Sequence, residues 1–67
     1  MNRYTRADLV AEFEHTRPRH HGVVSVAAPI FGMTAKALAK ALYRARAAGH
    51  VVAFRDDSAR PKVRVNA

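Results

Sequence analysis

The chain has 67 residues, and its 12 Lys and Arg against 5 Asp and Glu give a formal net charge of +7. This length leaves room for one small domain and excludes a two-domain enzyme. Because the chain has no cysteine, no disulfide or thiolate metal site can stabilise it, and its basic balance points to an anionic partner.

The first predicted element is a helix over residues 5–16. Thr5 is followed three residues later by Asp8, which is close to a capping box, and Leu9 and Phe13 fall on one face at helical spacing. Pro18 disfavours helical backbone at the residue before it. The helix is therefore expected to end near residue 16, with a short basic loop over residues 17–22.

The middle of the chain predicts a short strand and two further helices. Residues 23–24 are both valine and β-prone, and a short helix is predicted over residues 26–31 with Ser25 as its N-cap. Gly32 ends that helix. The longest helix is predicted over residues 35–48, because this segment is rich in strong helix formers.

The last predicted element is a β-hairpin over residues 50–66. Residues 50–54 and 62–65 are β-prone, and the segment between them is rich in turn-forming residues. Alternation along the second strand places valines on one face and basic side chains on the other. The hairpin would close the core on one side and present positive charge on the other.

The acidic residues lie only near the two ends of the chain, at positions 8, 12, 14, 56 and 57. The long middle stretch carries only positive charges and histidines. A solvated surface normally mixes the two signs. The distribution therefore favours a surface that contacts phosphates over a basic face that only keeps the chain soluble.

The order helix, tight turn containing glycine, helix is typical of a helix-turn-helix. The positions that carry this pattern are Ala28, Gly32, Met33, Thr34 and Leu38. They resemble the bacterial helix-turn-helix motif, and together with the first helix and the basic hairpin the whole chain resembles a winged helix-turn-helix domain. The resemblance implies an α+β fold, a single domain over residues 1–67 with a three-helix core and a C-terminal β-hairpin wing.

This resemblance also implies a DNA-binding site, with the outer face of the third helix in the major groove. The residues expected to meet base edges are Thr34, Ala35, Lys36, Ala39, Lys40 and Tyr43. Those expected to contact phosphates are Arg44 and Arg46 on the same helix, Arg17 and Arg19 in the loop, and Arg55, Arg60, Lys62 and Arg64 in the hairpin, whose tip lies on the backbone or in the minor groove. The alanines could instead be helix-forming filler, and Tyr43 could pack on a neighbour.

The predicted function is sequence-specific binding of double-stranded DNA by a small transcriptional regulator of a bacterium or phage, acting as a homodimer or cooperative assembly. One alternative is an excisionase-like recombination directionality factor, and another is an architectural or silencing DNA-binding protein. A third, from a different class, is a protein- or RNA-interaction module. No apolar run approaches the roughly 18 residues of a membrane span, so a cytoplasmic, nucleoid-associated protein is expected.

Catalysis and metal binding are not predicted. The chain has two serines and no cysteine, and no acid is paired with a histidine at a useful spacing. His15, His20 and His21 could suggest a metal site, but adjacent histidines in a loop point apart. We therefore expect a solvated loop there, with no metal and no cofactor.

Overall fold

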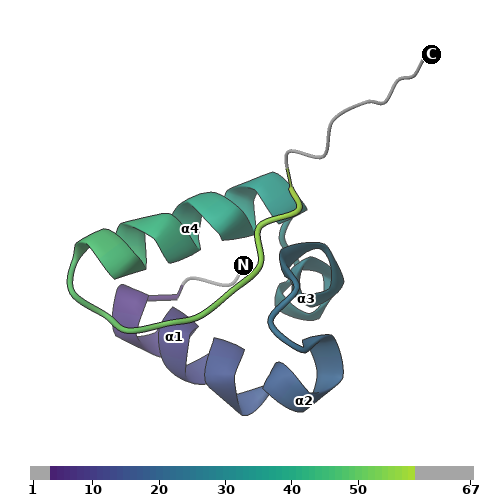
Figure 1. The fold of residues 1–67 in the computed structure, drawn as a ribbon, viewed down its shortest axis with the longest axis horizontal. Helices are drawn as coiled ribbons and strands as arrows, with labels where there is room; N and C mark the ends of the chain where they lie inside the picture. The colour runs from purple at the N-terminus through teal and green to yellow at the C-terminus, as the bar shows by residue number, and fades with distance from the viewer. Residues whose placement is uncertain (1–3, 59–67) are drawn as a thin grey trace.

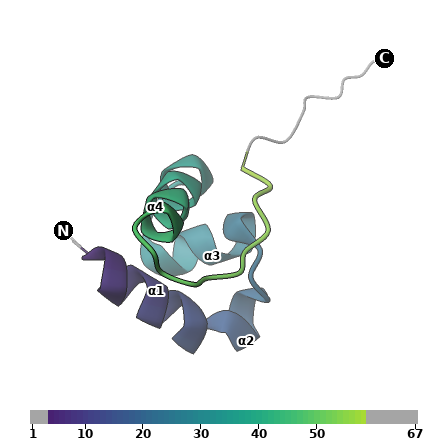
Figure 2. The same ribbon diagram turned by 60° about the vertical axis from the view of Figure 1, so that its left-hand side comes forward.

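The computed structural model describes residues 4–58. Within them the chain forms four helices, α1 (Arg6–His15), α2 (Arg17–His20), α3 (Val24–Phe31) and α4 (Ala35–Ala47). Helix α4 packs against both α1 and α3, and α2 joins the ends of α1 and α3 (Figure 1). After α4 the chain turns back and runs without helix along the molecule toward the first turn of α4 (Figures 1 and 2). We call residues 50–58 the strap.

Helix α1 has the cap that its sequence predicts. The Thr5 side chain accepts a hydrogen bond from the Asp8 amide at 3.0 Å, which satisfies one of the free donors of the first turn. Leu9 and Phe13 are buried on the inner face. The helix ends at His15, and the Thr16 hydroxyl donates to the Glu12 carbonyl at 2.7 Å.

The predicted loop over residues 17–22 is wrong over residues 17–20, because these form α2 directly after α1. Pro18 lies in the first turn of α2, where a missing amide hydrogen leaves no bond unmade. His20 is fully buried against Phe13, with the two ring centroids 4.4 Å apart. This packing outweighs the proline's effect on Arg17, and the expected solvated histidine loop is not formed.

The predicted strand over residues 23–24 is also wrong. Val23 forms only an isolated parallel bridge with Arg55, and Val24 is the first residue of α3. Val23 is the N-cap and contributes no side-chain bond. The expected cap, Ser25, lies inside the first turn, where its amide and hydroxyl donate to Asp57 at 2.9 and 2.5 Å.

The connection between α3 and α4 is a tight turn of the predicted kind. Gly32 has φ +68°, in the left-handed region that glycine adopts without strain. The Met33 amide donates a hydrogen bond to the Ala28 carbonyl at 3.0 Å. Thr34 then caps α4, accepting from the Ala37 amide at 3.1 Å. The predicted helix over residues 35–48 corresponds to α4, Ala35–Ala47.

The β-hairpin predicted over residues 50–66, and with it the α+β class, is wrong for the part that the structure describes. Residues 4–58 contain no strand, and the strap has only the bridge at Arg55. The described domain is all-helical. The second half of the predicted hairpin, with Arg60, Lys62 and Arg64, lies outside the described residues. The β-prone strap finds its backbone partners at the junction of α2 and α3 and in arginine side chains.

The core is small and relies on alanine as well as on bulky residues. Phe13 and Phe31 lie at its centre with ring centroids 6.3 Å apart. The other buried apolar residues are Leu9, Val24, Ala27, Ala28, Leu38, Ala39, Leu42, Ala45 and Val52. The small alanines let α3 and α4 approach closely. Over residues 4–58, none of the helices is both long and apolar enough to cross a bilayer.

Candidate nucleic-acid interface

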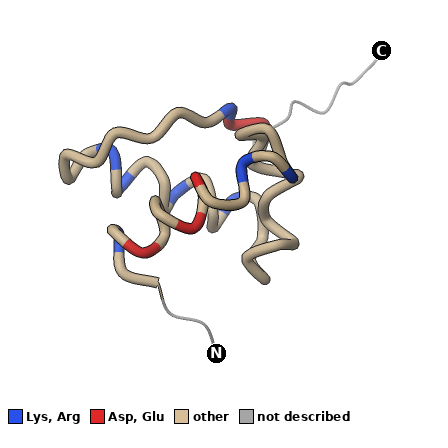
Figure 3. Tube along the Cα trace, turned by 90° about the horizontal axis from the view of Figure 1, so that it is seen from below, with Lys and Arg blue, Asp and Glu red and all other residues tan. Residues whose placement is uncertain are grey.

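Three cations form a row along the exposed side of α4. Lys36, Lys40 and Arg44 follow one another at four-residue spacing, so they share one face of the helix, and all three side chains are exposed. Within residues 4–58 none of them takes part in an ion pair or a side-chain hydrogen bond. Figure 3 shows that the acidic positions lie on α1 and at the end of the strap. We call these three residues the basic row.

The basic row borders three shallow hollows, and two of them make one continuous surface. The first is lined by Met33, Thr34, Lys36, Ala37, Lys40, Ala41 and Arg44. The second lies between α4 and the start of α1 and is lined by Tyr4, Thr5, Arg6, Leu9, Ala41 and Arg44. Since Ala41 and Arg44 line both, the surface extends from the first turn of α4 to Arg6.

The open surface of α4 is wider than the face that sequence periodicity predicts. A third hollow is lined by three residues of the predicted face, Ala39, Lys40 and Tyr43, together with Lys36, Arg44, Ala47, Asp56 and Ser58. The first hollow extends the open surface to Ala37 on the other side of the basic row. Ala37 and Arg6 belong to this surface, although the sequence reasoning did not select them.

Ala39, one of the predicted base-contacting residues, is only 3 % exposed. It is part of the core cluster and contributes only a small surface to a hollow on α4, so its predicted contact with a base stays a prediction. Ala35 is half-buried and also packs against the core. Thr34 is exposed, and its hydroxyl oxygen accepts the cap bond from Ala37.

Tyr43 and Arg46 face the strap. The ring of Tyr43 packs edge-on against Phe54, with centroids 5.1 Å apart, and a hydrogen bond with the Asp56 carboxylate raises the pKa of Tyr43. Arg46 donates to the Val52 carbonyl at 2.9 Å, and its guanidinium lies 4.3 Å from the centre of the Phe54 ring. Both side chains hold the strap against α4.

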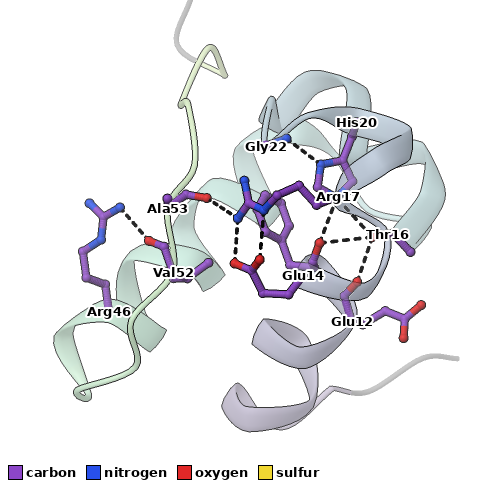
Figure 4. A network of polar contacts seen from close by, with 10 residues as sticks. Glu12, Glu14, Thr16, Arg17, His20, Gly22, Arg46, Val52 and Ala53 are labelled. Carbon is purple, nitrogen blue, oxygen red and sulfur yellow. Dashed lines mark hydrogen bonds and ion pairs between the residues drawn. The ribbon is translucent and has the colours of Figure 1, made fainter.

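Arg17 also holds the strap, from the opposite side (Figure 4). Its guanidinium forms two bonds to the Glu14 carboxylate, at 2.9 and 2.6 Å, and a third to the Ala53 carbonyl at 2.6 Å. The bond from Arg17 lowers the pKa of Glu14. A guanidinium with this many protein partners is poorly placed to bind a phosphate.

The remaining predicted phosphate contacts lie away from the basic row. Arg19 is exposed on α2, a helix that contacts α1 and α3. The side chain of Arg55 is exposed, while its backbone joins the strap to the α2–α3 junction through bonds with Gly22 and Val24. The structure therefore brings together Lys36, Lys40 and Arg44 and does not add Arg17, Arg19, Arg46 or Arg55 to them.

His20 is the polar residue whose role the sequence reasoning missed. Its Nδ1 accepts from the Gly22 amide at 2.9 Å, so the neutral ring carries its hydrogen on Nε2, which lies 3.1 Å from the Phe13 carbonyl and 3.0 Å from the Thr16 hydroxyl. Burial lowers the pKa of His20. Spacings of three and four residues along positions 13, 16 and 20 could have revealed this buried face.

No cluster of three or more potential ligands is placed to hold a metal ion in the described part of the chain. Comparisons with known proteins found no family model, no curated protein and no solved structure that matches this chain.

Proposed function

We propose that the domain binds double-stranded DNA, with the N-terminal half of α4 in the major groove. The observation that carries the proposal is the basic row. Lys36, Lys40 and Arg44 are exposed on one helix face and form no ion pair among the described residues, although Asp56 lines one of the hollows that they border. Like charges four residues apart on a helix repel by a few tenths of a kcal/mol. Phosphates of a bound duplex would remove that repulsion.

The dimensions of the row suit a groove. At a rise of 1.5 Å per residue, the backbone positions of Lys36 and Arg44 are about 12 Å apart, close to the width of the major groove. Lysine can donate to the O6 and N7 atoms of guanine, and arginine forms bidentate bonds with a phosphate. The small side chain of Ala37 permits a close approach. We assign Lys36 and Lys40 to base edges or nearby phosphates, and Arg44 to a phosphate.

This proposal uses one helix and no wing. A single helix presents a short footprint, and sequence discrimination then needs two copies bound to adjacent sites, as a homodimer or a cooperative assembly. The role in transcription stays a prediction of the sequence.

The experiment is a duplex-binding titration by fluorescence anisotropy, repeated at several stated salt concentrations. The unmodified chain should lose affinity steeply with salt. Replacing all three residues of the basic row by glutamine should lower the slope of log K against log salt by up to about 2.7, since each phosphate contact contributes about 0.9. Arg19→Gln, the matched single-charge control on α2, should change the slope less than Lys40→Gln.

Two outcomes would overturn the proposal. One is the absence of duplex binding at about 50 mM salt, where electrostatic binding is strong. The other is equal binding by the unmodified chain and the triple variant. Tighter binding of single-stranded RNA than of duplex DNA would favour the RNA-interaction module instead.

A further inference from the structure

The strap is fixed at both of its sides by specific bonds. On the α4 side Arg46 donates to the Val52 carbonyl, and on the α2 side Arg17 donates to the Ala53 carbonyl. Next along the strap, the Arg55 amide donates to the Gly22 carbonyl at 2.7 Å. The Val24 amide donates to the Arg55 carbonyl at 3.0 Å, so Gly22 is one of two backbone anchors of the strap at the junction of α2 and α3.

The same glycine is bonded to the buried imidazole of His20. The Gly22 amide donates to Nδ1 at 2.9 Å, and its carbonyl accepts from the strap. A proton added to Nδ1 would place two donors face to face. The Gly22 amide can find a new acceptor only if the peptide between His21 and Gly22 moves. The carbonyl that accepts from Arg55 belongs to the next peptide, which shares the Cα atom of Gly22, so a displacement of that Cα atom also moves the carbonyl.

Space around Gly22 links this movement to a second anchor. An added Cβ at this glycine would lie 2.5 Å from Nη1 of Arg17. The backbone of Gly22 therefore lies directly against the guanidinium that holds the Ala53 carbonyl. A movement of Gly22 toward Arg17 would displace this guanidinium, which couples the bond between Gly22 and Arg55 to the bond between Arg17 and Ala53.

The charges around His20 do not favour an imidazolium. Helix α2 contributes Arg17, and His21 at its C-terminal end also disfavours a charged ring, while α1 contributes one nearby carboxylate, Glu14, which is already bonded twice to Arg17. Helix α3 has no titratable residue, and the charged residues of α4 are all basic. The strap carries Arg55, Asp56 and Asp57, of which Asp56 is bonded to Ser58 and Asp57 to Ser25. Desolvation adds to this and lowers the pKa of His20 below its ordinary value of 6.5.

We infer that His20 is a proton-sensitive latch for the strap. When the ring takes up a second proton, the strap detaches from Gly22 and Arg17, its bonds with Val24 and Ser25 are lost with them, and Tyr43 and Arg46 lose their contacts with Phe54. The four helices stay assembled, because most of their shared core is formed by side chains other than His20 and Val52 of the strap. The inference concerns the protein alone and does not depend on the proposed DNA binding.

The test is an NMR titration of the whole chain from about pH 7.5 to about pH 4.5, a range that covers histidine titration. Ring nitrogen shifts report the protonation of His20, and amide exchange corrected to protection factors reports opening at each residue. Protection of the Arg55 amide should fall at least about tenfold as His20 protonates. Leu38 and Leu42 of α4 should stay protected, and the ring contact between Tyr43 and Phe54 should be lost.

Two variants separate the latch from its surroundings. His21→Gln removes the exposed neighbouring histidine and should leave the pH response of the strap unchanged. His20→Asn places an amide oxygen near the position of Nδ1 and cannot take up the proton, so protection of Arg55 should no longer depend on pH. If His20→Asn fails to fold, the titration of the unmodified chain still decides.

Either of two results in that titration overturns the inference. In one, His20 protonates while protection of Arg55 is unchanged. In the other, Leu38 and Leu42 lose protection at the same pH as Arg55, which would mean that the whole domain unfolds instead of releasing the strap.

Discussion

Two sets of basic residues in this domain have the same charge and opposite surroundings. Arg17 and Arg46 each donate to a carbonyl of the strap and lie near an aromatic ring. Lys36, Lys40 and Arg44 have no such partner within residues 4–58. The comparison teaches that a count of positive charges overstates the surface available to an anion, because some arginines stabilise the fold.

The needs of the strap explain why the residues that hold it, Arg17 and Arg46, are arginines. An extended segment without a neighbouring strand leaves its carbonyls without donors, and an unpaired buried carbonyl costs free energy. The planar guanidinium offers several donors at once, so Arg17 binds Glu14 and Ala53 together. Lysine, which has a compact ammonium group, could not reproduce this geometry.

The largest expected effect on the free energy of unfolding comes from Gly22→Ala, which places a methyl group against Arg17 of the first set. Gly22 has φ +79°, a strained backbone for alanine that costs about 1–3 kcal/mol, and Arg17 can avoid the new methyl only by moving from Ala53. We expect the free energy of unfolding to fall by about 2 kcal/mol or more, measured by urea denaturation.

Gly49→Ala is the control for that variant. Gly49 has φ +104° and nothing within 4 Å of an added Cβ, so it carries backbone strain alone. If Gly22→Ala is no more destabilising than Gly49→Ala, Arg17 does not depend on the space beside Gly22.

The next largest effect on the free energy of unfolding comes from removing Arg17. Arg17→Ala deletes the bonds to Glu14 and Ala53, and because its side chain is 31 % exposed we expect a loss of about 1–2 kcal/mol in urea denaturation. DNA affinity of the folded variant should change less than in Lys40→Gln. A large loss of DNA affinity without a loss of stability would show that Arg17 contacts DNA, as is proposed for the basic row, and does not stabilise the fold.

A smaller effect on the free energy of unfolding is expected when the pH is lowered. Arg17 lowers the pKa of Glu14 below its ordinary 4.5, so this pair adds stability above that pH and loses it as the pH falls through the lowered value. The Glu14 side chain is 47 % exposed, which keeps the contribution under about 1 kcal/mol. The stability difference between the unmodified chain and Glu14→Gln should therefore shrink from about pH 6 to about pH 3.

Glu12→Gln serves as the control in that series, because Glu12 forms no ion pair within the described residues. A difference for Glu14→Gln that stays constant with pH would show that the carboxylate adds nothing through its charge.

The smallest effect on stability is expected in the second set. Replacing Lys36 and Lys40 by alanine removes a like-charge pair and adds helix propensity, so urea denaturation should show a change of a few tenths of a kcal/mol, toward greater stability. A loss above about 1 kcal/mol would show that these lysines make internal contacts. The contrast between the two sets would then fail.

The elements that the sequence predicts well are those with local signals. Thr5 and Thr34 cap α1 and α4 through bonds three residues away, and Gly32 closes α3 within one turn. Each of these features depends on neighbouring residues alone. The existence of both capped helices and of the turn could therefore be predicted without knowledge of the fold.

The features that sequence reasoning missed depend on distant residues. Arg17 meets Ala53 across 36 positions, and Ser25 meets Asp57 across 32. The β-prone residues 50–54 are extended in the structure, but their partners are side chains and a helix junction, which a propensity does not reveal. The contact of Tyr43 with Phe54 also depends on the position of the strap on α4, while the predicted contact of Tyr43 with DNA stays a prediction.

The strap has a consequence for the order of folding. Its docking platform combines Arg17 of α2, Ser25 of α3 and Arg46 of α4, so the platform exists only after these helices have assembled. Contacts that form after the folding transition state slow unfolding without speeding folding. The strap therefore governs how long the folded domain lasts more than how quickly it forms.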